Sequence, residues 1–112
     1  TANQKQRAKQ NMARALSTAE FVAKAIIGSA HRMGGGAGEY AEAKWLQVKN
    51  TRDVQKLKDM SEGLLNDTKR RMANKDVQGA SRYNTARNII EIRLLTLGVA
   101  IPEVKLHYPL FP

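Results

Sequence analysis

The sequence contains no cysteine, which excludes disulfide frameworks, thiolate zinc sites and cysteine nucleophiles. Aromatic residues make up only 5% of the chain, so the core must be built mainly from Ala, Leu, Ile, Val and Met. No run of 18 apolar residues occurs, and we therefore expect no transmembrane helix. Acidic residues are absent before Glu20, so the first part of the chain carries charge of one sign.

The remaining composition fits one small, basic, folded domain or a pair of small helical units with tails. The chain has 112 residues, and an apolar fraction of 42% is enough to form a core. Lys and Arg number 19 against 10 Asp and Glu, which gives a net charge of +9. A balance of this kind suits a polyanion, a membrane surface or an acidic partner.

The first helical segment is expected at about 4–33. Small or apolar residues recur there at three- and four-residue spacing, which is the helical period. These residues are Met12, Leu16, Ala19, Ala23, Ile26 and Ala30. Because the small side chains bury little area, the helix requires close contact with a long partner helix. We expect Ala19 and Ala23 to contribute to a partner interface.

The glycine-rich segment 34–38, with Gly at 34, 35, 36 and 38, predicts the end of this helix, followed by a hinge. A second helical segment follows at 39–73, with an apolar seam that includes Leu46, Leu57 and Leu64. It is either one helix or two helices that are split near Asn50. The order of these segments leaves both a long helical hairpin and a bundle open.

A last helix is expected to begin after Asp76, which is a candidate N-cap residue, and to end at Gly98. Its apolar arc widens from Ile89 onward, which predicts the most deeply buried helix of the set. The predicted fold is all-α: a long helical hairpin or a three- or four-helix bundle with a glycine-rich hinge. The helical domain occupies residues 1–98 and includes a basic N-terminal arm.

Residues 99–112 change character and predict an extended interaction tail. Prolines at 102, 109 and 112 forbid helix there, and apolar side chains alternate along the segment. An apolar tail of this kind is expected to pack along its own helices or on a neighbouring subunit. The residues assigned to that interface are Val104, Leu106, Tyr108, Leu110 and Phe111.

Motifs for catalysis, metal binding and cofactor binding are missing from the sequence. The glycine run is followed by Glu39 and Tyr40 rather than by Lys-Ser or Lys-Thr, so it is not a phosphate-binding loop. His31, with Glu39 nearby, falls short of a metal site and fits a surface histidine at a helix C-terminus. We therefore expect no cofactor and a protein that is not an enzyme.

Basic residues are the strongest functional indication, because they can contact the phosphates of nucleic acid. No helix-turn-helix, zinc-finger or RNP motif accompanies them, so contact without sequence-specific readout is expected. Trp45 is either a core residue or, if exposed, an aromatic platform for bases. The candidate contacts are Lys5, Arg7, Lys9, Arg14, Lys49, Arg52, Lys56, Lys69, Arg70 and Arg71.

These features together favour a non-catalytic structural or interaction subunit of a multi-protein assembly that contacts nucleic acid. A virion connector, tail or internal protein, or a ribonucleoprotein component, fits this description, in a virion or in the cytoplasm. Its partners would be sister subunits or other chains of the assembly. Two alternatives stay open: a small basic DNA- or RNA-binding regulator, and an accessory subunit of an organellar membrane complex. The acid-poor, Ala- and Arg-rich start, which is typical of transit peptides, permits the latter and a mitochondrial location.

Overall fold

The computed structural model describes residues 2–98, except for the side chains of Ala8 and residues 11–17. This part of the chain is all-α, as the sequence predicts, and contains four helices with no strand. The helices are α1 (Ala2–Met33), α2 (Ala37–Val48), α3 (Val54–Ala73) and α4 (Val77–Thr96).

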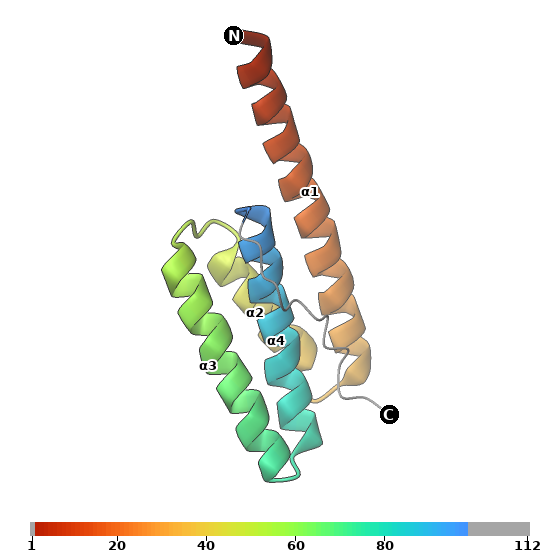
Figure 1. Ribbon diagram of the computed structural model, residues 1–112. Helices are drawn as coiled ribbons and strands as arrows, with labels where there is room; N and C mark the ends of the chain where they lie inside the picture. The colour runs from red at the N-terminus through yellow and green to blue at the C-terminus, as the bar shows by residue number, and fades with distance from the viewer. Residues whose placement is uncertain (1, 99–112) are drawn as a thin grey trace.

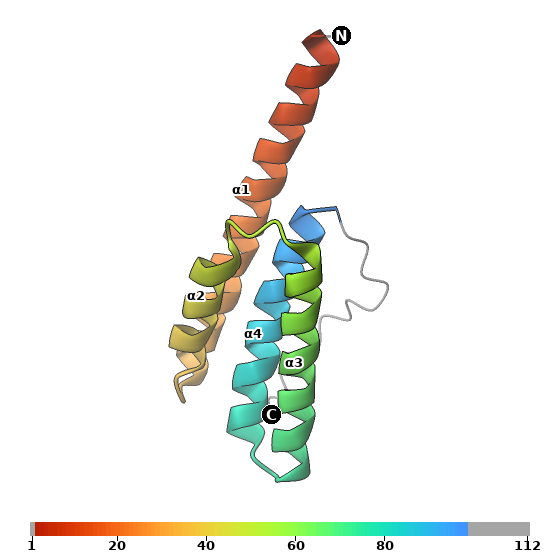
Figure 2. The ribbon, with the colours of Figure 1, turned by 90° about the vertical axis from the view of Figure 1, so that its left-hand side faces the viewer.

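The helices form two layers, one of α1 and α2 and the other of α3 and α4 (Figure 2). Helix α4 lies at the centre and packs against the other three helices. Helix α1 runs beyond the body formed by the others, so its N-terminal end projects from the molecule (Figure 1). This arrangement separates a packed body from a free helical end.

A tight glycine turn joins α1 to α2. Gly34, Gly35 and Gly36 have φ angles of 78°, 67° and 77°, a left-handed conformation that side chains disfavour. The sequence places the break at 34–38, but α2 begins at Ala37, so the non-helical segment is shorter than expected. Gly38 lies inside α2 against the ring of His31. The three glycines are therefore what lets α2 reverse direction beside α1.

The second predicted segment is two helices, and Asp53 marks the start of α3. Its side chain accepts a hydrogen bond from the backbone N–H of Lys56 at 3.1 Å, which caps the helix. Asp76 caps α4 in the same way, as predicted, by accepting from the N–H of Gly79 at 2.9 Å. Helix α4 ends before Gly98, whose φ of 79° suits its predicted terminating position.

The core joins both layers. Trp45 is 5% exposed, so it is a core residue rather than an exposed platform for bases. The continuous seam expected for 39–73 is wrong in α2, where Ala41, Trp45 and Val48 are buried and Leu46 is exposed. The connection at 49–53 is not helical, so the three- and four-residue spacing of buried residues in α3 does not continue into α2.

The small residues of α1 also face this core. Ala19 and Ala23 are buried within the chain itself, where α1 packs on α2 and α4. The close-packing partner of this seam is therefore supplied by the chain's own helices, and these two side chains are not open to a second chain. The predicted tail interface at Val104, Leu106, Tyr108, Leu110 and Phe111 lies outside the described residues.

Candidate nucleic-acid interface

The projecting end of α1, residues 2–18, is called the basic arm below. At a rise of 1.5 Å per residue, α1 is about 48 Å long and α4 about 30 Å, and this difference accounts for most of the projection. Lys5, Arg7 and Lys9 are exposed on the arm. The residue that follows the arm, Ala19, has a buried side chain, so the packed body begins there. The side chain of Arg14, the fourth predicted contact on the arm, lies outside the described residues.

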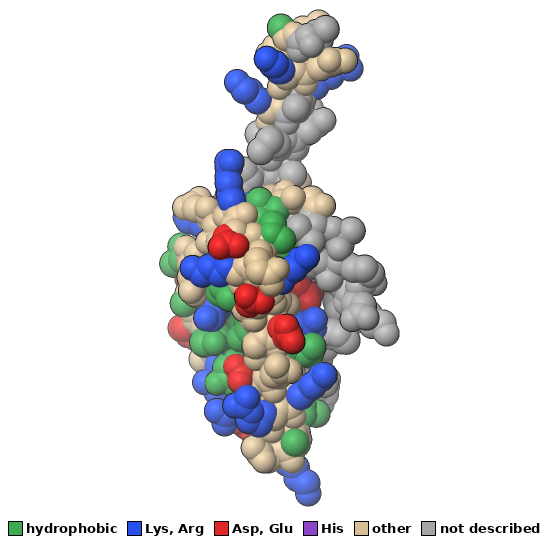
Figure 3. Space-filling model, turned by 60° about the vertical axis from the view of Figure 1, so that its left-hand side comes forward, with side chains coloured by type: hydrophobic (Ala, Val, Ile, Leu, Met, Phe, Trp, Pro, Cys, Tyr) green, Lys and Arg blue, Asp and Glu red, His purple; other side chains and the backbone are tan. Residues whose placement is uncertain are grey.

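The described cations of the arm have no acidic neighbour. The sequence has no acid before Glu20, and Glu20 itself pairs with Lys24 at 3.6 Å. In the face shown in Figure 3, the charged side chains drawn on the projecting end are all basic, whereas basic and acidic side chains are interspersed over the body. The arm therefore carries positive charge that the described part of the chain does not neutralise.

The basic run at the end of α3 is different, because acids accompany it. Arg70 lies 3.5 Å from Asp67, and Arg71 lies 3.3 Å from Asp76. The Arg71 guanidinium also stands 5.7 Å from the centre of the Tyr83 ring. The nearby phenol group of Tyr83, and then the carboxylate of Asp76, raise the pKa of Arg71. Lys69, the third residue of this run, is exposed. It has no carboxylate within 4 Å among the described residues.

The expected row Lys49-Arg52-Lys56 is broken by the end of α2. Lys49 is the C-cap residue of α2, Arg52 lies in the connection, and Lys56 lies in the first turn of α3. Lys49 is half-buried, whereas Arg52 and Lys56 are exposed. These three cations do not form one helical face, so the basic arm is the stronger candidate for a polyanion.

Three charged residues inside α4 were missed by the sequence analysis. Arg87 and Glu91 form a buried ion pair at 3.0 Å, and the Nε of Arg87 donates to Ser61 on α3. The Nε of Arg93 donates to the carbonyl of Thr51 at 3.0 Å, which ties α4 to the connection before α3. The four-residue spacing of Arg87 and Glu91 is the one sequence feature that indicates this pair.

Burial shifts the pKa values of Glu91 and Arg93. Burial raises the pKa of Glu91, and the charge of Arg87 opposes part of that rise. Burial lowers the pKa of Arg93, and the nearby Arg52 lowers it further. These charges hold helices together inside the body and lie away from the basic arm.

His31, which the sequence analysis weighed as a metal ligand, lies between two carboxylates. Its Nδ1 is 3.6 Å from Glu39, as expected from the sequence, and its Nε2 is 3.8 Å from Glu42. All three side chains are well exposed. Within residues 2–98, no set of three or more His, Asp and Glu side chains is arranged to hold a metal ion.

In the same part of the chain, no helix has both the length and the apolar character that crossing a membrane requires. A comparison of the chain with protein family models, with curated proteins and with solved structures finds no match.

Proposed function

We propose that this protein is a non-catalytic helical subunit of a larger multi-protein assembly, and that it contacts nucleic acid through the basic arm. The observation that supports this most is the arm itself. It extends away from the body and presents Lys5, Arg7 and Lys9 with no carboxylate beside them among the described residues. A virion or a ribonucleoprotein is the kind of assembly that fits a chain of this charge.

Phosphate contact is the interaction that this geometry favours. A bare helix with cations on it can follow the backbone of a duplex or a single strand, and each contact releases counterions. The helix presents no motif for reading base edges, so affinity is expected to vary little with sequence. The body then serves as the part that packs against other subunits.

The test compares two variants with equal charge loss. In the arm variant, Lys5, Arg7, Lys9 and Arg14 are all changed to Gln. In the body variant, Arg52, Lys56, Lys69 and Arg70 are changed to Gln; all four are exposed. Both variants lower the net charge by the same amount, so a difference between them reports position rather than total charge.

Binding is measured by fluorescence anisotropy of labelled duplex DNA and single-stranded RNA at moderate salt. We expect the arm variant to bind about tenfold more weakly or worse, and the body variant to lose much less affinity. Equal losses in the two variants would contradict the proposed role of the arm. A stable small oligomer with strong preference for one base sequence would favour a regulator instead, and recovery with lipid would favour a membrane-complex subunit.

A further inference from the structure

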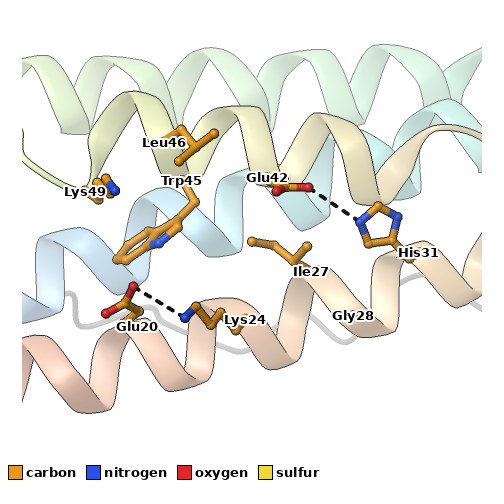
Figure 4. Close-up of a pocket in the computed structure, with 9 residues that line it drawn as sticks. All are labelled: Glu20, Lys24, Ile27, Gly28, His31, Glu42, Trp45, Leu46 and Lys49. Carbon is orange, nitrogen blue, oxygen red and sulfur yellow. Dashed lines mark ion pairs between the residues drawn. The ribbon is translucent and has the colours of Figure 1, made fainter.

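A groove runs between α1 and α2 on the outer side of their layer. It has a volume of about 380 Å³ and opens to solvent along its length (Figure 4). Ile27 and Gly28 of α1 and Trp45 of α2 lie along it, so its floor is apolar. Among the described residues, all those that line the groove come from α1, α2 and the C-cap of α2, so the groove belongs to the α1–α2 layer.

Two large apolar side chains next to the groove are exposed to solvent. Leu46 lines the groove and is 58% exposed, and Phe21 of α1 is 76% exposed. Phe21 lies on the same helical face as Lys24 and Gly28, which are three and seven residues further on and line the groove. Exposed apolar residues that border an apolar groove are typical of an interaction surface.

The charges along the groove are balanced, unlike those of the chain as a whole. Two carboxylates, Glu20 and Glu42, and two lysines, Lys24 and Lys49, line it, whereas the chain carries +9. A second copy of so basic a chain is repelled at most approaches. The charged residues that line the α1–α2 groove sum to zero, so that repulsion is small there.

The α2 side of the groove carries opposite charges at its two ends, and the Glu20–Lys24 ion pair on the α1 side adds no net charge. Lys49 lies at one end without an acid within 4 Å among the described residues, and Glu42 lies at the other beside His31 (Figure 4). Glu39 adds a second carboxylate at the His31 end. On α2, Glu39, Glu42, Leu46 and Lys49 follow at three- and four-residue spacing and so share one face.

We propose that a second copy of this chain covers the α1–α2 face, related by a two-fold axis that crosses both helices. In this arrangement Lys49 of each copy meets Glu39 and Glu42 of the other. Phe21 and Leu46 of each copy then pack toward the apolar groove of the other, as a self-complementary two-fold interface requires. Helix α2 is short, so the dimer is expected to be weak, with a dissociation constant of about micromolar or above.

This interface is separate from the basic arm. Loss of the dimer would leave the proposed contact with nucleic acid standing, and loss of nucleic-acid binding would leave the dimer standing. The two proposals are therefore tested independently, one by the mass of the protein without nucleic acid and the other by nucleic-acid binding.

The test is a charge swap followed by sedimentation equilibrium from micromolar to high micromolar concentration. One variant carries Lys49→Glu, and the other carries Glu39→Lys together with Glu42→Lys. Each places like charges against each other in its own dimer, so we expect each to dimerise at least tenfold more weakly than the wild type. An equimolar mixture restores opposite charges at both contacts and is expected to dimerise again.

The control is Lys58→Glu, which makes the same charge change as Lys49→Glu at an exposed position on α3. We expect this variant to dimerise as the wild type does, and circular dichroism checks that each variant stays helical. A wild type that is monomeric throughout, a mixture that does not recover, or an equal effect of Lys58→Glu would overturn the proposal.

Discussion

Single residues inside α4 show where sequence reasoning stops. The apolar pattern correctly predicts that Ile89, Ile90 and Leu94 are deeply buried. It does not predict that Glu91 and Arg93 are buried among them, because a charged side chain in a sequence is assigned to the surface by default. Their burial depends on partners such as Thr51, which is 42 residues from Arg93.

Glu91 gives a prediction that depends on pH. Its pKa is raised by burial, so the folded protein holds this proton more tightly than the unfolded chain does. The stability that Glu91 contributes is therefore full below its ordinary pKa of 4.5 and is lost as pH rises through its folded pKa. We expect the wild type to lose stability relative to Glu91→Gln as pH rises from about 4.5 toward neutral.

Urea unfolding of both proteins across this pH range measures the difference in free energy of unfolding. Other carboxylates titrate in both proteins and cancel in the comparison. A wild type that gains stability relative to Glu91→Gln as pH rises would show that the ion pair with Arg87 outweighs burial.

At the scale of helices, the residues at which a helix begins and ends follow from local chemistry. Which face of the helix is buried does not. Asp76, the glycine run and Gly98 mark ends that the sequence predicts, since caps and left-handed positions depend on neighbouring residues. The buried face of α2 is set by packing against α1 and α4. Leu46 and Trp45 are adjacent in sequence, and only that packing decides which of them is buried.

The two glycines Gly36 and Gly63 give a matched pair of substitutions. An added Cβ meets no atom within 4 Å at either position, but Gly36 has a φ of 77° and Gly63 lies inside α3. We expect Gly63→Ala to stabilise the protein by about 0.5–1 kcal/mol, and Gly36→Ala to destabilise it by about 1–2 kcal/mol. Thermal unfolding measures both, and changes of the same sign would contradict the turn geometry.

Removal of a helix cap tests the start of α3. Asp53→Ala removes the acceptor for the N–H of Lys56 and is expected to cost about 1 kcal/mol of folding free energy. Asp53→Asn keeps a side-chain oxygen at the same place and should retain most of that stability. If chemical denaturation shows equal losses for Ala and Asn, the cap is not what Asp53 contributes.

At the scale of the whole molecule, helix α1 belongs to both the packed body and the basic arm. The second half of α1 lies in the body and lines the α1–α2 groove, and its first half extends beyond the body as the basic arm. The sequence predicts a basic, acid-free start, but it cannot show that this start projects, since projection follows from the different lengths of α1 and its neighbours. Assembly through the body and polyanion contact through the arm can therefore occur at the same time.

The most direct test of this account is the salt dependence of nucleic-acid binding by the arm variant. On duplex DNA, the slope of log K against log salt changes by about 0.9 for each phosphate that the protein no longer neutralises. With four cations removed from the arm, we expect the slope to flatten by up to about 3–4, and to change far less in the body variant. An arm variant with the wild-type slope, together with a flattened slope in the body variant, would contradict the account.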